Sequence, residues 1–151
     1  MKPRLNYYPL APASVKQLAA VNKTFETFSI PAALRALIEL RVSQLNGCAY
    51  CVDMHSRQAR RLGELQRRLD ALPVWRESPF FDERERALLA WTEALTFVAE
   101  THAPDDLYEA LSEHFSGQEI VEVSLIISVM NAWNRMGIGF RKLPEDVKSH
   151  A

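Results

Sequence analysis

Apolar residues recur along this chain at every third or fourth position, the spacing that places them on one face of an α-helix. The pattern predicts helices over residues 14–25, 31–46, 48–62, 64–72, 83–99, 105–115 and 117–134. No segment shows the strict alternation of apolar and polar residues that is typical of a half-buried β-strand. The sequence therefore predicts an all-α fold of six or seven helices. Because no repeat or linker interrupts the pattern, we expect a single domain over residues 1–151.

Residues with known preferences for helix ends mark several of these boundaries. Ser29 and Pro31 predict the start of the second helix, because proline is tolerated in a first helical turn. Asn46 and Gly47 form a C-cap pair that is expected to end it. Pro73 is predicted to close the short fourth helix.

The last helix is apolar on nearly its whole circumference between residues 120 and 133. Such a helix has to be buried on all sides, either in the centre of the domain or between subunits. Its longest uncharged stretch, residues 123–134, is shorter than the ~20 residues that a membrane-spanning helix needs. We therefore expect no membrane segment, and the apolar helix favours a homo-oligomer.

Composition narrows the possible partners and the compartment. The 151 residues are 48% hydrophobic and 25% charged, which is typical of a globular protein. A net charge of −1 gives no global field that would attract nucleic acid or an acidic membrane surface. The N-terminal residues lack the apolar stretch of a secretory signal. We expect a cytoplasmic protein that binds neither nucleic acid nor membranes.

The only two cysteines, Cys48 and Cys51, lie three positions apart at the predicted start of the third helix. In a reducing compartment such a pair is more often catalytic or metal-binding than structural. Free N–H groups and the positive end of the helix dipole favour a thiolate there. The spacing also brings the two sulfur atoms close enough to form a disulfide. The pair is the first candidate for chemistry.

His55 distinguishes the two cysteines. It lies four residues after Cys51, one helical turn away, but seven residues after Cys48. Helix position alone would select Cys48 as the nucleophile, whereas a base one turn away selects Cys51, which we prefer. Cys48 is then the thiol that attacks a Cys51 sulfenic acid. The three residues could instead supply three zinc ligands, but nothing nearby completes the set, so we expect no metal and no cofactor.

Residues 40–55, LRVSQLNGCAYCVDMH, closely resemble the core motif of the AhpD-like alkylhydroperoxidases, within the carboxymuconolactone decarboxylase superfamily. Residues 131–135 resemble a second segment of its small members, and the likeness extends from about Leu34 to Phe140. The resemblance implies an all-helical fold assembled into trimers or hexamers. It also implies thiol-dependent reduction of peroxides, with Cys51 as the peroxidatic cysteine, Cys48 as the resolving one and His55 in the proton relay.

Two positions depart from the family pattern. Ala36 stands where the family relay normally has a glutamate, twelve residues before the first cysteine. The nearest carboxylate is Glu39, on an adjacent part of the same helical face, and it is our candidate for the missing acid. Tyr50 occupies the position before the second cysteine, where the best-known relay has a histidine. We expect Tyr50 to form a wall of the site or to donate a hydrogen bond, because a phenol is a poor base at pH 7.

The leading hypothesis is a thiol peroxidase that reduces alkyl hydroperoxides or hydrogen peroxide through a Cys48–Cys51 disulfide. The resemblance implies a dithiol reductant, either a lipoyl or a thioredoxin-like protein. One alternative is an enzyme with the decarboxylase chemistry of the superfamily's other branch, which has no use for two reactive thiols. Another is a non-catalytic binding protein that the disulfide switches.

Overall fold

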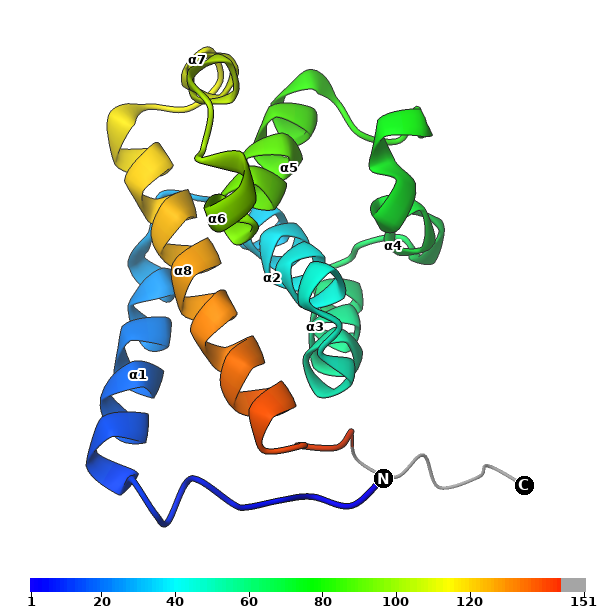
Figure 1. Cartoon of the computed structure of the whole chain (residues 1–151). Coiled ribbons are helices and arrows are strands. Elements are labelled where there is room, and N and C mark those ends of the chain that lie inside the picture. The colour runs from blue at the N-terminus through cyan, green and yellow to red at the C-terminus, as the bar shows by residue number, and fades with distance from the viewer. Residues whose placement is uncertain (145–151) are drawn as a thin grey trace.

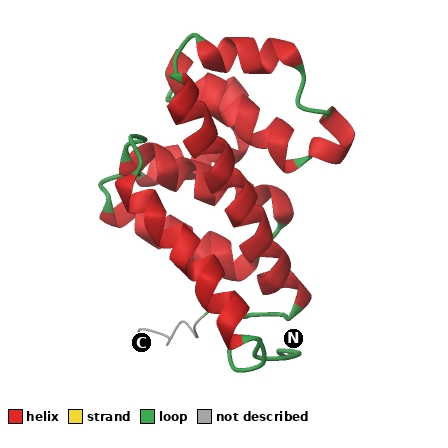
Figure 2. Ribbon diagram, turned by 90° about the vertical axis from the view of Figure 1, so that its left-hand side faces the viewer, coloured by secondary structure: helices red, strands yellow, loops and turns green. Residues whose placement is uncertain are grey.

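Residues 1–144 are described by the computed structural model of the chain; residues 145–151 of the predicted domain lie outside this description. The α-helices are α1 (Pro12–Thr24), α2 (Ala32–Asn46), α3 (Ala49–Arg61), α4 (Gln66–Ala71), α5 (Glu83–Thr96), α6 (Val98–Thr101), α7 (Asp105–Ser112) and α8 (Gly117–Gly139). Two 3-10 helices, η1 (Phe25–Thr27) and η2 (Leu72–Glu77), connect them. No strand occurs within residues 1–144, so the predicted all-α class is confirmed (Figure 2).

The longest helix, α8, crosses the molecule and packs against α2 and α5, while α1 runs along its lower half (Figure 1). α2 also packs against α3, to which it is joined by a short turn. The core lies where α2, α5 and α8 meet. Its fully buried side chains are aliphatic and come from all three helices: Leu37, Ile38, Leu40, Leu88, Leu89, Ile126 and Ile127.

Eight α-helices occur in residues 1–144, where the sequence predicted six or seven. The additional helix arises because the segment predicted as one helix over 83–99 is divided. α5 ends at Thr96, and Phe97 leaves helical geometry with φ −102° and ψ 37°. The Thr101 hydroxyl donates a hydrogen bond to the Ala94 carbonyl at 2.6 Å, which holds α6 against the end of α5. Apolar periodicity continues across this break, so the pattern did not reveal it.

Two predicted helix ends differ in their details. Pro73 does not end a helix but lies in the first turn of η2. Proline is tolerated there because the backbone N–H groups of a first turn have no partner within the helix. Ser29 does not cap α2, whose N-cap is Pro31. The Ser29 amide and hydroxyl instead donate to Glu122 Oε2 on α8, at 2.9 and 2.7 Å. Gly47 ends α2 in the left-handed conformation, as predicted.

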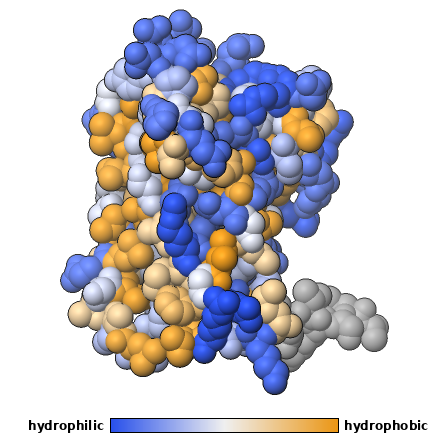
Figure 3. All heavy atoms as spheres, viewed as in Figure 1, coloured by the Kyte–Doolittle hydropathy of each residue, from blue (hydrophilic) through white to orange (hydrophobic). Residues whose placement is uncertain are grey.

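The single chain does not bury α8 on all sides, so burial in the centre of the domain, the first of the two predicted alternatives, is not observed; burial between subunits stays a prediction. Val121 is 58% exposed and Leu125 is 43% exposed, although the opposite side of the helix is in the core. Apolar residues also gather on the molecular face of Figure 3, along the side formed by α8 and α1. Within residues 1–144, no helix combines the length and apolar character needed to cross a membrane.

A partly buried carboxylate, Glu93 on α5, joins the core helix α2 to η2. Glu93 Oε1 accepts hydrogen bonds from Arg41 Nε at 2.9 Å, Arg41 Nη2 at 2.7 Å and Trp75 Nε1 at 2.7 Å. Arg76 Nη1 donates to Oε2 at 2.5 Å. Burial alone would raise the pKa of Glu93, but the hydrogen bonds from Trp75, Arg76 and Arg41 outweigh it and lower that pKa.

Substitution of Glu93 tests how much this network stabilises the fold. We expect Glu93→Gln to lower the free energy of unfolding by about 3 kcal/mol at pH 7, because Arg41 is left buried without its counter-charge. Since the folded-state pKa lies below the unfolded value near ~4.3, this stabilisation is complete above that value. It is lost as the pH falls through the folded-state pKa.

Urea unfolding of both proteins between pH 7 and pH 3 measures this difference. The gap between wild type and Glu93→Gln should close in acid, where a protonated Glu93 resembles glutamine. Glu109→Gln, on the exposed side of α7, is the control and should change stability by less than about 0.5 kcal/mol. A gap that is independent of pH would contradict an ionised Glu93 as the source.

Candidate active site

The two cysteines form a disulfide at the start of α3. Gly47 turns the chain out of α2 with φ 70°, and Cys48 follows as the N-cap residue of α3. The Cys48 sulfur accepts a hydrogen bond from the Cys51 amide at 3.4 Å, and the two Cα atoms lie 5.3 Å apart. Both side chains are buried. The predicted position of the pair, in the first turn of a helix, is therefore confirmed.

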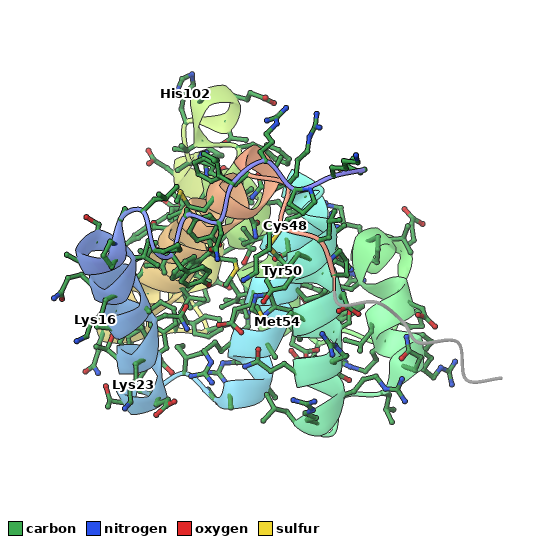
Figure 4. All side chains as sticks on the ribbon, turned by 90° about the horizontal axis from the view of Figure 1, so that it is seen from below. Lys16, Lys23, Cys48, Tyr50, Met54 and His102 are labelled. Atoms are coloured by element: carbon green, nitrogen blue, oxygen red, sulfur yellow. A yellow bond between two sulfur atoms is a disulfide. The ribbon has the colours of Figure 1, made fainter. Side chains whose placement is uncertain are left out.

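Cys51, but not Cys48, lines a cavity of about 430 Å³ between the N-terminal segment, α1, α2, α3 and α8. Tyr50 and Met54 line the same cavity from the side of α3 that faces α1 (Figure 4). His55 and Glu39 also line it. The structure thus brings four of the predicted site residues to one cavity, with Cys48 directly behind Cys51.

His55 and Glu39 approach each other closely at the base of this cavity. His55 Nδ1 lies 3.4 Å from Glu39 Oε2 and 3.2 Å from Gln58 Oε1. Both side chains are almost completely buried, Glu39 on α2 and His55 on α3. Ala36 is buried in the core instead. Glu39, the carboxylate nearest in sequence to position 36, therefore lies in contact with His55.

Two buried polar atoms, Glu39 Oε2 and His55 Nε2, have no hydrogen-bond partner within residues 1–144. Two oxygen atoms, Glu39 Oε2 and Gln58 Oε1, lie near Nδ1, and an imidazole with its proton on Nδ1 has a free lone pair on Nε2. A base fixed in this tautomer can take a proton from a thiol or give one to a leaving oxygen. A carboxylate at this distance can stabilise an imidazolium.

Tyr50 is held by a lysine from the end of the chain that follows α8. Lys142 Nζ lies 4.0 Å from the centre of the Tyr50 ring and 3.3 Å from the Tyr8 hydroxyl. Burial would lower the pKa of Lys142, but hydrogen bonds to Tyr50 and Tyr8 outweigh it and raise that pKa. Lys142 therefore stays charged and links Tyr50 to Tyr8 through a cation–π contact and a hydrogen bond.

The N-terminal segment before α1 is a strap across this cavity, and sequence analysis did not identify it. The Arg4 amide donates to the Phe140 carbonyl at 3.0 Å, and Arg4 Nη1 donates to the Gly139 carbonyl at 2.9 Å. Tyr7 is buried against Phe140, and burial raises its pKa to about 12. A segment without periodicity gives no signal for such a role, because its contacts are to residues more than 130 positions away.

Gly137 is a second residue that the sequence analysis missed. A Cβ atom at this position would lie 3.1 Å from Cys48 Sγ and 3.5 Å from Cys51 Sγ. The backbone of α8 reaches the disulfide this closely because residue 137 has no side chain. A glycine within the last turns of α8 was the available signal for a close approach.

An amide network connects the end of α2 to α8 beside the cysteines. Asn46 Nδ2 donates to Asn131 Oδ1 at 3.0 Å and to Asn134 Oδ1 at 2.9 Å. Asn134 Nδ2 donates to the Ser43 hydroxyl at 3.2 Å. These bonds fix the turn that carries Cys48. No group of three or more histidine, cysteine or acidic residues in the described chain is arranged to hold a metal ion.

Comparison with known proteins assigns this chain to a family. The sequence profile of the carboxymuconolactone decarboxylase family matches residues 13–94. The uncharacterized protein YdfG of Bacillus subtilis is 39% identical over 138 residues, which are 91% of this chain and 94% of YdfG.

Solved structures agree with this match. A protein of unknown function from Agrobacterium tumefaciens, provisionally assigned to the AhpD antioxidant defence proteins, superposes with a TM-score of 0.94. It is 42% identical and covers 96% of this chain and 99% of its own. The debrominase Bmp8 superposes with a TM-score of 0.80 at 25% identity, over 89% of this chain and 72% of its own. The profile covers more than half of the sequence, and the chain belongs to the carboxymuconolactone decarboxylase family, with an AhpD-like fold.

Proposed function

We propose that the protein is a thiol-dependent peroxidase that reduces alkyl hydroperoxides or hydrogen peroxide through the Cys48–Cys51 pair. One observation carries the proposal: Cys51 lines a cavity together with His55, whose Nε2 is buried and unpaired. Glu39 lies behind the imidazole at 3.4 Å. This arrangement supplies a nucleophile, a proton carrier and a carboxylate that orients the carrier.

The first step oxidises Cys51. The Cys51 thiolate attacks the nearer peroxide oxygen, the O–O bond breaks, and Cys51 becomes a sulfenic acid while the substrate becomes an alcohol or water. The leaving oxygen needs a proton, which the His55 imidazolium donates. His55 obtains this proton from the Cys51 thiol when the thiolate forms. The carboxylate of Glu39 stabilises the charged ring between these two transfers.

The second step forms the observed disulfide, and a dithiol then reduces it. The Cys48 thiol attacks the sulfenic sulfur, so that an S–S bond forms, the S–O bond breaks and water leaves. A lipoyl or thioredoxin-like dithiol returns both cysteines to thiols and becomes a disulfide itself. We place this cycle in the cytoplasm, where such reductants are abundant.

We also propose that the protein is a homo-oligomer, a trimer or hexamer, with a second copy of this chain on the exposed side of α8. Val121 and Leu125 line a shallow groove there with Trp91 and Tyr108. An apolar groove of this kind on a single chain is suited to burial between subunits.

Replacing each cysteine in turn tests the assignment of roles. Cys51→Ser should abolish turnover of cumene hydroperoxide with dihydrolipoamide, because the attacking sulfur is gone. Cys48→Ser should leave a Cys51 sulfenic acid, which dimedone traps and mass spectrometry locates. A Cys51→Ser protein that keeps the wild-type rate contradicts the nucleophile. One round of disulfide formation without turnover would indicate a redox switch. Decarboxylation of a lactone substrate by the variant with both cysteines replaced by serine would indicate a decarboxylase.

Substitutions of the relay should lower the rate in a graded manner. His55→Gln should reduce kcat/KM about 100-fold, since general acid–base catalysis typically contributes that much or more. Glu39→Gln should reduce it less, by about tenfold, because the carboxylate acts through His55. His114→Gln, on the exposed side near the end of α7, is the control. Wild-type kcat/KM for Glu39→Gln between pH 6 and pH 8 would remove Glu39 from the relay.

Charged substitutions on α8 test the assembly. Val121→Glu combined with Leu125→Glu should convert the oligomer to monomers, because two carboxylates would be buried without partners. Light scattering and sedimentation measure the mass at micromolar concentration. Val74→Glu, an exposed apolar position on η2, should leave the mass unchanged. A wild-type monomer at this concentration would refute the assembly.

A further inference from the structure

The guanidinium of Arg35 is a partly buried cation that the proposed chemistry does not use. Arg35 lies on α2 one turn before Glu39, lines the cavity, and has a side chain only 16% exposed. Its contact in the described chain is an ion pair in which Nε lies 4.0 Å from Glu39 Oε1. A guanidinium has five N–H donors. The side chain lines the cavity, and its Nη1 and Nη2 groups have no hydrogen-bond acceptor among residues 1–144.

A second unpaired cation lies at the rim of the same cavity. Figure 4 shows Lys23 in the last turn of α1. This side chain is exposed, lines the cavity and has no ion pair within residues 1–144. Lys142 also lines the cavity, but tyrosines engage its charge. Two carboxylates oppose these cations, Glu39 beside His55 and the exposed Glu26 at the rim. The Lys23 ammonium on α1 and the Arg35 guanidinium on α2 are thus available to bind an anion in the cavity.

The rest of the cavity is suited to an apolar body. Met54 and Met130 line it together with the ring of Trp133. Flexible methionine side chains and an indole face adapt to hydrocarbon or aromatic groups. A ligand that satisfies both parts of the cavity has an apolar or aromatic body and one negatively charged group. A ligand without charge that fills the cavity displaces water from the guanidinium and supplies no acceptor in its place, which costs binding free energy.

We propose that the cavity contains an anion subsite formed by Arg35 and Lys23, and that the substrates are hydroperoxides carrying a carboxylate. The second part of this inference rests on the proposed peroxidase function. Arg35 is then the specificity-determining residue, since its planar fork of donors matches a carboxylate in a bidentate pair. The hydroperoxyl group of the same molecule lies at Cys51.

The charges around the subsite favour a monoanion. Glu39 lies only 4.0 Å from Arg35 Nε, so it already compensates part of the guanidinium charge. A dianion such as a phosphate monoester would meet this carboxylate at close range, and like charges repel strongly where water is excluded. A single carboxylate gains the two terminal donors of Arg35 with less repulsion.

A matched pair of substrates tests the subsite by turnover. We expect 4-carboxycumene hydroperoxide to have about a tenfold higher kcat/KM than its methyl ester, mostly through KM, because a charge-assisted bidentate pair is lost in the ester. Arg35→Gln should remove this preference, and Arg35→Lys should keep part of it. Lys16→Gln, two turns before Lys23 on α1 and outside the cavity, should leave the preference unchanged. If Arg35→Gln slows both substrates equally, Arg35 acts only through Glu39 and the subsite is refuted.

Calorimetry separates the subsite from the catalytic proposal. The disulfide form is titrated with 4-isopropylbenzoate and with methyl 4-isopropylbenzoate, neither of which can react. If the wild-type protein binds the carboxylate more tightly than the ester and Arg35→Gln does not, the subsite is supported. This holds even if no hydroperoxide is turned over, because absence of turnover contradicts only the proposed peroxidase function. Equal binding of the two probes, or a preference that survives Arg35→Gln, overturns the inference.

Discussion

The two-residue connection between α2 and α3 determines the rest of the site. α2 ends at Asn46 and α3 begins at Ala49, so only Gly47 and Cys48 turn the chain. A turn this short requires the left-handed backbone that Gly47 adopts with φ 70°. It makes the two helices neighbours and leaves Cys48 at the N-cap, where helix N–H groups are free. The helix-start position of the cysteines follows from the same turn that sets the packing of α2 against α3.

α8 completes the site from the opposite side. Asn131 and Asn134 bind the Asn46 side chain, so the turn is fixed to the longest helix of the fold. One turn further along, the bare backbone at Gly137 lies beside both sulfur atoms. Gly137 and Cys51 line the cavity, whereas Cys48 does not. The close approach of α8 to the two cysteines thus depends on the absence of a side chain at Gly137.

Local signals predicted the parts of the site that depend on neighbouring residues. The Gly47 cap, the helix-start position of Cys48 and Cys51, and the one-turn spacing of His55 all follow from short-range geometry. The strap around Tyr7 and the cavity-lining side chain of Arg35 did not follow, because they arise from tertiary packing. The break at Phe97 was likewise hidden, since apolar periodicity continues across it. Exposed apolar positions on α8 could not be predicted either, because periodicity does not specify what covers a helix.

The position of Glu39 follows from the same connection. In two helices joined by a short turn, residues at equal distances from the turn lie opposite each other. Glu39 is seven residues before the end of α2, and His55 is six residues after the start of α3, so both lie about two turns from the junction. A carboxylate at position 36 would lie nearly one turn farther away, level with Gln58 and Ala59. Ala36 can therefore be a core residue, while Glu39 places a carboxylate at the level of the imidazole.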